Sequence, residues 1–307
     1  MNSAELLMIA LLLDAAIGDP NWLWTRAPHP VVLMGKLISW LDKTQNSGLN
    51  RKANGVWVLC TLIATAGAVG WGLSFAGPVV EVVLVMILLA HRSLLDHIKA
   101  VAEGLAISES AGREQVARIV GRDTKNLDGA QITRATLESA AENLSDGVVA
   151  PALWFLIGGL PGLFIYKTIN TADSMIGYRN MAYRDFGWAT ARFDDLLNLI
   201  PARLTAALIA LMHGQYDSWK QIRRDAGLHR SPNAGWPEAA MALTLDVALS
   251  GPRAYEGRME SFPWVNRDGR KTLEISDIHQ ACATLWKTWA GLLALLQIVI
   301  LLLALPV

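Results

Sequence analysis

Residues 55–75 read GVWVLCTLIATAGAVGWGLSF and contain no charged side chain. A helix needs about 20 mainly apolar residues to cross the roughly 30 Å hydrocarbon core of a bilayer, so this stretch is long enough to span one. A short turn follows, and residues 78–95 are again mainly apolar, with Glu81 near the start and His91, Arg92 and Ser93 near the end. We therefore expect a helical hairpin in the membrane, and the rest of the chain is interpreted around it.

The composition agrees with a membrane protein. Hydrophobic residues make up 52% of the chain and charged residues only 18%, whereas charged residues make up about a quarter of an ordinary soluble domain. The formal net charge is zero, so no overall positive field favours a nucleic-acid partner. Cys60 and Cys282 have no spacing typical of a disulfide framework or a zinc site.

The apolar segments define a single all-α domain over residues 1–307, a polytopic integral membrane protein with cytoplasmic helical segments. Four full transmembrane helices are expected, at 3–17, 55–75, 78–95 and 288–306. Two further apolar stretches, 147–166 and 196–213, contain Gly or Pro and are predicted to be broken or re-entrant helices, which in membrane proteins line buried or wet sites. A full crossing by each is the alternative. Lys and Arg gather in 18–54, 91–146 and 214–287, which places these connections in the cytoplasm.

A ladder of carboxylates precedes the first broken segment. Glu138, Glu142 and Asp146 are four residues apart, which aligns them on one face of a helix. A solvated face with Arg134 as partner is the simpler interpretation. The neighbouring Asn143 and the membrane segment that follows favour a magnesium–phosphate site, because Mg²⁺ takes carboxylate oxygens together with water and substrate phosphates.

His29 lies between Pro28 and Pro30, so it is not expected inside a regular helix. The sequence favours a structural role and a role as ligand or general base about equally, since Asp14 and Asp19 are near in sequence and an imidazole titrates near neutral pH.

Two polar clusters follow the first broken segment, and the second of them runs into the start of 196–213. Lys167, Asp173 and Arg179 alternate in charge along one stretch, and Asp194, Asp195 and Asn198 follow within about one helical turn of each other. Buried charges have to be paired or liganded. The sequence pattern fits an internal salt-bridge network and a phosphate site equally well.

Residues 230–242 read RSPNAGWPEAAMA. Pro237 and Glu238 are typical of a first helical turn, where proline is tolerated and an acid faces the positive end of the helix dipole. The simpler interpretation is a capped helix start, and the alternative is a ligand-binding loop. The chain has neither a P-loop nor a Gly-rich dinucleotide motif.

Seven motifs in order give the chain a specific resemblance. They are GDP (18–20), PHPVxxMG (28–35), GRDT (121–124), ESxAENxSDGxxAP (138–151), NTxDSMIGYRN (170–180), ARxDDLxNxIPAR (191–203) and SPNAGWPEAAMA (231–242). Together they resemble the cobalamin-biosynthesis CobD/CbiB family of adenosylcobinamide-phosphate synthases, over about residues 11–260. The resemblance implies that adenosylcobyric acid is joined to an amino-alcohol phosphate, (R)-1-amino-2-propanol O-2-phosphate or a relative, by ATP- and Mg²⁺-dependent amide formation.

The resemblance also implies a multi-pass protein of the inner (cytoplasmic) membrane with its site facing the cytoplasm. Lipid and other membrane-associated late enzymes of the pathway are expected partners, and nucleic acid is not. A non-catalytic membrane sensor or an ion-coupled transporter on the same scaffold is the alternative. Transport, however, predicts inverted repeats and acids near the middle of the bilayer, and the sequence contains no repeat.

Roles are assigned on this basis as hypotheses. The metal ligands are Glu138, Glu142 and Asp146. The catalytic residues are His29, Asp173, Asp194 and Asp195. The substrate- and phosphate-binding residues are Arg122, Asn143, Lys167, Asn170, Arg179, Asn198, Arg203, Asn233 and Glu238.

Overall fold

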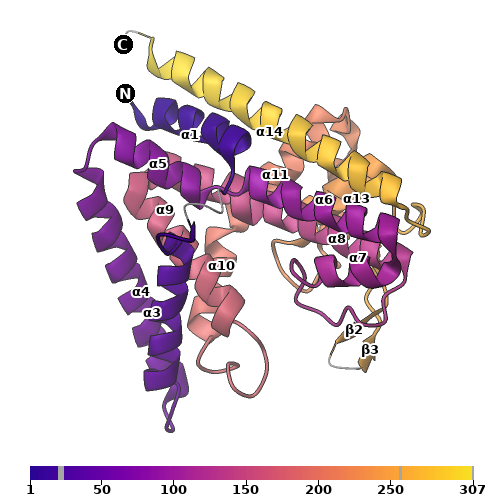
Figure 1. The fold of residues 1–307 in the computed structure, drawn as a ribbon, viewed down its shortest axis with the longest axis horizontal. Helices are drawn as coiled ribbons and strands as arrows, with labels where there is room; N and C mark the ends of the chain where they lie inside the picture. The colour runs from indigo at the N-terminus through magenta and orange to yellow at the C-terminus, as the bar shows by residue number, and fades with distance from the viewer. Residues whose placement is uncertain (20–23, 256–257, 306–307) are drawn as a thin grey trace. The chain divides into compact units, whose positions relative to one another are not determined.

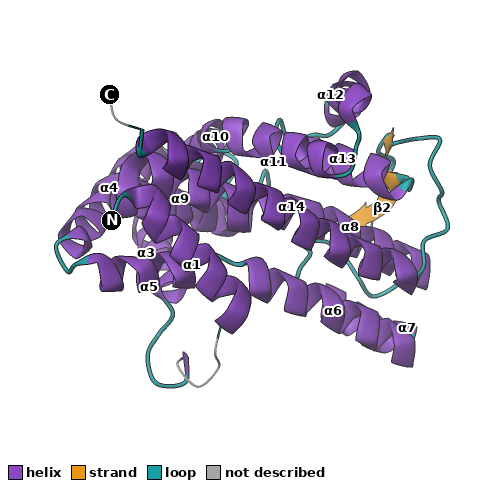
Figure 2. Ribbon diagram, turned by 90° about the horizontal axis from the view of Figure 1, so that it is seen from above, coloured by secondary structure: helices purple, strands orange, loops and turns teal. Residues whose placement is uncertain are grey.

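Helices dominate the computed structural model, which describes residues 1–19, 24–255 and 258–305 (Figures 1 and 2). Within these residues, strands occur only as two short antiparallel pairs. β1 (Leu249–Ser250) pairs with β4 (Trp264–Val265), and β2 (Arg253–Tyr255) pairs with β3 (Arg258–Glu260). The all-α class expected from the sequence is confirmed, and the four short strands were not predicted.

The first of two compact units consists of Met1–Ala90 and Ala150–Asn198. Its helices are α1 (Ser3–Ile17), α3 (Pro30–Gln45), α4 (Arg51–Ser74), α5 (Pro78–Leu88), α9 (Ala150–Ile176) and α10 (Trp188–Leu197). Helix α9 packs against both α3 and α4, which lie side by side in Figure 1. The core between them includes Ile38, Leu62, Ile169 and Phe186.

The second unit consists of His91–Val149 and Leu199–Leu305. It contains α6 (His91–Ile107), α7 (Glu109–Val116), α8 (Gly129–Leu144), the π-helix η1 (Ser145–Val149), α11 (Leu199–Met212), the 3₁₀ turn η2 (Tyr216–Ser218), α12 (Trp219–Ala226), α13 (Gly235–Leu245), the four strands and α14 (Ile275–Leu303). Reciprocal capping boxes begin two of these helices. Asp128 and Gln131 cap α8, and Glu274 and Asp277 cap α14, which satisfies backbone N–H groups that have no partner within the helix.

Four helical runs are long and apolar enough to cross a membrane: Arg51–Ser74, Pro78–Ile107, Gly129–Ile176 and Ile275–Leu303. The chain is a multi-pass membrane protein. The expected segments 55–75 and 288–306 each fall within such a run apart from the last residues, and α14 begins thirteen residues earlier than predicted. The segment 78–95 is interrupted at Leu89–Ala90 and resumes as α6. Helix α1 has 15 residues, so the expected span 3–17 is shorter than a full crossing requires.

Both predicted helix breaks are present. Within α9, Gly159 has φ +58°, a left-handed conformation that glycine adopts readily, and Pro161 beyond it has no N–H for the helical ladder. The second break separates α10, which ends at Leu197, from α11, which begins at Leu199. The pair is either one broken span or a re-entrant loop, so the alternatives left open by the sequence stay open here.

One glycine of the first unit is required by close packing. A Cβ at Gly55 of α4 would overlap the backbone carbonyl of Phe186. We expect Gly55→Ala to destabilise the protein by about 1–3 kcal/mol through overpacking, measured as a lower midpoint of thermal unfolding in detergent. Gly72→Ala on the same helix is the control, because nothing lies within 4 Å of a Cβ there. It should leave the midpoint unchanged or raise it, and equal effects of the two substitutions would contradict the packing argument.

Candidate functional site

Three carboxylates gather between α9 and α10 in the first unit. Asp173 comes from α9, whereas Asp194 and Asp195 come from α10, and their charges interact directly with one another. The two helices meet because Ile169 and Ile176 of α9 and Leu197 of α10 share the buried core. Packing of apolar neighbours therefore brings together acids that are 21 and 22 residues apart in sequence.

Amides and a phenol fix the buried member of this cluster. Asp194 is 9% exposed, and its carboxylate accepts hydrogen bonds from Nδ2 of Asn198 at 3.0 Å and from Nδ2 of Asn170 at 3.4 Å. The Oη of Tyr166 donates to Oδ1 of Asn198 at 3.0 Å. A connected polar network thus holds Asp194 in one orientation, whereas the side chain of Asp173 is half-buried.

Two arginines partly neutralise the charge of Asp195, the third carboxylate of the cluster. Nη1 of Arg192 lies 3.7 Å from Oδ2 of Asp195, and the charge of Arg179 also acts on Asp195. Both arginine side chains are exposed. The stretch 166–198 therefore combines acids, amides and guanidinium groups within one unit. The ion pair of Arg192 with Asp195 agrees in part with the expected salt-bridge network. The exposed guanidinium groups are also suited to an anionic ligand. Lys167 lies on α9, the helix that also carries Asp173, and is half-buried.

The loop after α9 is anchored to α3. Oη of Tyr183 donates to Oδ2 of Asp42 at 3.1 Å. Burial, followed by this hydrogen bond and the negative charge of Asp42, raises the pKa of the Tyr183 phenol. The phenol therefore stays protonated at neutral pH and keeps its role as a donor.

His29 caps helix α3. Its Nδ1 accepts a hydrogen bond from the N–H of Val31 at 3.1 Å, and its Nε2 lies 3.7 Å from Oδ1 of Asp19. The ring also packs edge-on against Trp24. With the Nδ1 lone pair already engaged, this geometry favours the structural role, and the general-base role stays a prediction. Residues 20–23 of the surrounding motif lie outside the described residues.

The three carboxylates of the ladder, which lies in the second unit, differ in their exposure to solvent. Glu138 is 4% exposed, and its carboxylate accepts from Nη2 of Arg122 at 2.6 Å and from the N–H of Ser250 at 2.7 Å. Glu142 and Asn143 are exposed, and Asp146 is half-buried at the start of the π-helix η1. Nδ2 of Asn143 donates to the carbonyl oxygen of Ser139 at 2.9 Å.

The expected three-carboxylate metal site is not formed. No group of three or more His, Cys, Asp or Glu side chains within residues 1–19, 24–255 and 258–305 is arranged to hold a metal ion. Glu138 and Arg122 form a buried ion pair, which favours a structural role for both side chains, and the metal role of Glu138 and the phosphate role of Arg122 stay predictions. Arg134, the partner expected for the ladder, donates to the backbone oxygens of Ala248 and Lys271.

A second polar group surrounds the start of α13. Nη1 of Arg203 donates to Oδ1 of Asn233 at 3.3 Å, and its guanidinium stacks over the Trp236 ring at 4.6 Å. Glu238, in the first turn as predicted, is buried with Oε1 at 3.6 Å from Nε2 of His229. The helix therefore begins where the sequence predicts, with an acid in its first turn, but its N-cap residue Ala234 makes no side-chain capping hydrogen bond.

Comparison with known proteins identifies the family. The profile described as CobD/Cbib protein matches residues 7–285. The chain belongs to the CobD/CbiB family. A protein of Brucella suis biovar 1 named "Cobalamin biosynthesis protein CobD" is 50% identical over 301 residues, which cover 92% of both chains. Its namesake in Rhizobium meliloti is 48% identical over 306 residues, covering 91% of this chain and 92% of the relative. No solved structure matches this chain.

Membership of the CobD/CbiB family makes this chain a cobalamin biosynthesis protein. Within the family motif at 170–203, the structure brings together Asn170, Asp173, Arg179, Asp194, Asp195 and Asn198. Sequence reasoning missed Tyr166 in this network. Its place one turn before Asn170 is a signal that helical periodicity offers.

Proposed function

We propose that this CobD/CbiB protein is an adenosylcobinamide-phosphate synthase, an acid–amine ligase that joins adenosylcobyric acid to an amino-alcohol phosphate such as (R)-1-amino-2-propanol O-2-phosphate, with ATP and Mg²⁺. The observation that carries the proposal is the acid–amide–arginine cluster of Asp173, Asp194, Asp195, Asn170 and Arg179 in a member of this family. An amino-alcohol phosphate carries one cation and one anion, and such a cluster offers partners for both.

The reaction needs activation of a carboxylate. The substrate carboxylate takes the γ-phosphoryl group of ATP to give an acyl phosphate and ADP. The amine then attacks the acyl carbon, and inorganic phosphate leaves as the amide forms. We assign Asp173 to bind the substrate ammonium and to accept its proton before attack, because this acid is more exposed than Asp194. We assign Asp194, held by Asn170 and Asn198, to position the cluster beside Asp173.

The basic residues have the complementary task. Arg179 and Lys167 are assigned to phosphate oxygens of the amino-alcohol phosphate or ATP, with Arg203 and Asn233 as a second group in the other unit. A guanidinium suits phosphate because it donates two parallel hydrogen bonds. Arg203 already donates to the carbonyl of Leu199 at 2.7 Å and to Asn233, so its planar group is held in place before a ligand arrives.

The exposed end of the ladder fits magnesium that arrives with ATP. Mg²⁺ commonly binds one or two protein carboxylates, with phosphates and water completing the octahedron. Glu142 is exposed and Asp146 half-buried, so we assign these two oxygen donors to the ion and leave Glu138 out. When bound, the metal neutralises charge that develops on the transferred phosphoryl group.

The surface of the first unit supports a cytoplasmic site. Trp40 of α3, Trp57 of α4 and Trp188 of α10 are exposed, and Nζ of Lys52 lies 4.1 Å from the Trp188 ring centroid. Interfacial tryptophans beside basic residues are typical of the cytoplasmic boundary of a membrane protein. We place this end of the unit at the inner face of the cytoplasmic membrane.

The deciding experiment is reconstitution. The purified chain in detergent is incubated with adenosylcobyric acid, the amino-alcohol phosphate, ATP and Mg²⁺, and the product is followed by mass spectrometry. We expect one adenosylcobinamide phosphate and one ADP for each turnover, with no product when ATP is omitted or EDTA is added. Tight binding of adenosylcobyric acid without ATP-dependent product would instead support a non-catalytic sensor.

Glu142→Gln tests the metal assignment. Removing one charged ligand should raise the Mg²⁺ concentration needed for half-maximal activity by about tenfold or more, while excess Mg²⁺ restores part of the rate. The measurement is the initial rate at graded Mg²⁺. Glu114→Gln, an exposed glutamate on α7, is the control and should leave the curve unchanged. A variant Glu142→Gln with an unaltered Mg²⁺ curve would remove this residue from the metal site.

A further inference from the structure

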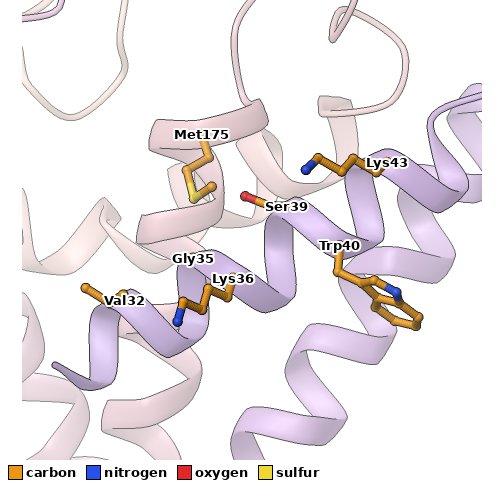
Figure 3. A pocket seen from close by; sticks show the side chains of 7 residues that line it. All are labelled: Val32, Gly35, Lys36, Ser39, Trp40, Lys43 and Met175. Atoms are coloured by element: carbon orange, nitrogen blue, oxygen red, sulfur yellow. The ribbon is translucent and has the colours of Figure 1, made fainter. Parts of the chain in front are cut away.

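An open groove of about 490 Å³ lies on the first unit between α3 and Met175 of α9 (Figure 3). Its polar lining is Lys36, Ser39 and Lys43, and its apolar lining includes Val32, Trp40 and Met175. Small-molecule sites typically have volumes of about 300–1,000 Å³. The groove is therefore large enough for a small ligand, and the function proposed above assigns no ligand to it.

Helical spacing aligns the polar residues. Positions 36, 39 and 43 differ by three, four and seven residues, so they lie on one face of α3, with the two lysines roughly 10 Å apart along the axis. Figure 3 shows the Ser39 hydroxyl and the Lys43 ammonium directed toward Met175. The flexible four-carbon stems of lysine allow both ammonium groups to approach one ligand beside Ser39.

The groove carries positive charge that is not compensated. In the part of the chain that the structure describes, neither Lys36 nor Lys43 forms an ion pair. The acid of the same helix, Asp42, accepts hydrogen bonds from Tyr183 at 3.1 Å and from Nδ2 of Asn46 at 2.9 Å. The Asp42 carboxylate is therefore engaged by Tyr183 and Asn46 and not by the groove lysines. Because the lysine charges are not neutralised, the groove favours an anion.

We propose that this groove binds the phosphate group of a small phosphomonoester or of a phospholipid headgroup. Two ammonium groups and a hydroxyl supply donors from separate positions, which suits an anion with several acceptor oxygens. Met175 and Val32 provide an apolar surface for the organic part of the ligand. The inference concerns binding alone, so it stands whether or not the bound compound is a substrate.

The test uses the full chain in a phosphate-free maltoside detergent. One arm titrates O-phosphoethanolamine, with binding followed by ³¹P NMR. The other arm measures retention of phosphatidylglycerol by native mass spectrometry. The variants are Lys36→Ala, Lys43→Ala and the double substitution. Lys220→Ala, an exposed lysine on α12, is the matched control. Because both groove lysines are exposed, their loss should leave the unfolding midpoint unchanged, and a thermal scan verifies this.

We expect each single substitution to weaken binding about tenfold and the double substitution about 100-fold, with Lys220→Ala equal to the unmodified chain. Loss in the phosphoethanolamine arm identifies a soluble phosphomonoester as the ligand, and loss confined to the lipid arm identifies a headgroup. Both results support the site. If the double variant binds phosphoethanolamine and retains phosphatidylglycerol as the unmodified chain does, the proposal is overturned. That result would leave the synthase proposal untouched, because the reconstitution assay uses other residues.

Discussion

Asp173→Asn is expected to lower the rate of amide formation at least about 100-fold while keeping the protein folded. A positioned acid–base group typically contributes a factor of 100 to 10,000 to a rate, and asparagine cannot accept the ammonium proton. The substitution also removes one of three carboxylates whose charges repel one another. The thermal unfolding midpoint should therefore stay the same or rise. The measurement is the steady-state rate in the reconstituted reaction, together with a thermal scan of each variant.

Asp185→Asn is the matched control for this prediction. Asp185 is an exposed carboxylate in the loop that joins α9 to α10, with Arg184 at 3.8 Å. Asp185→Asn removes one negative charge, as Asp173→Asn does, but outside the acid cluster. The rate should therefore change by less than about twofold. A variant Asp173→Asn that keeps its rate would falsify the catalytic role of this acid. Loss of activity together with a lower midpoint would point to a purely structural role.

The sequence predicted the helical class and the part of the acid cluster that lies on α10 for reasons that are local. Apolar runs such as 55–75 are sufficient to indicate membrane helices. Asp194, Asp195 and Asn198 lie within one turn, so their proximity follows from helical periodicity. Gly159 and Pro161 mark a break because each has a backbone property that a continuous helix does not tolerate well.

Contacts that depend on irregular segments were not predictable. Arg122 is 16 residues from Glu138 and precedes the helix through a loop, so no periodic rule connects the two. The N–H of Ser250 donates a second hydrogen bond to the Glu138 carboxylate, although Ser250 is 112 residues from Glu138 in sequence and has φ +63°. From the sequence, Glu138 and Glu142 are equivalent members of one helix face, and only the neighbouring Asn143 and the membrane segment that follows favour a common metal site.

The Arg122–Glu138 pair gives the second large expected effect. Arg122→Ala should destabilise the protein by about 3–5 kcal/mol, because it removes the guanidinium that lies 2.6 Å from the buried Glu138 carboxylate. The two side chains are only 8% and 6% exposed. We expect the thermal midpoint to fall by roughly 5 °C or more, to the same extent with and without Mg²⁺. Arg118→Ala, which breaks the exposed pair with Glu114, is the control and should change stability by less than about 1 kcal/mol.

A double substitution separates the structural role from a metal role. In Arg122→Met/Glu138→Leu neither charge is left buried alone, so stability should recover most of the loss seen in Arg122→Ala, since apolar replacements of buried ion pairs are often neutral. A coupling free energy near zero between the two positions would contradict direct pairing. If Glu138 were a metal ligand instead, Glu138→Gln would shift the Mg²⁺ curve as Glu142→Gln does and spare the midpoint. The buried pair predicts the reverse, because both oxygens of Glu138 already serve Arg122 and Ser250.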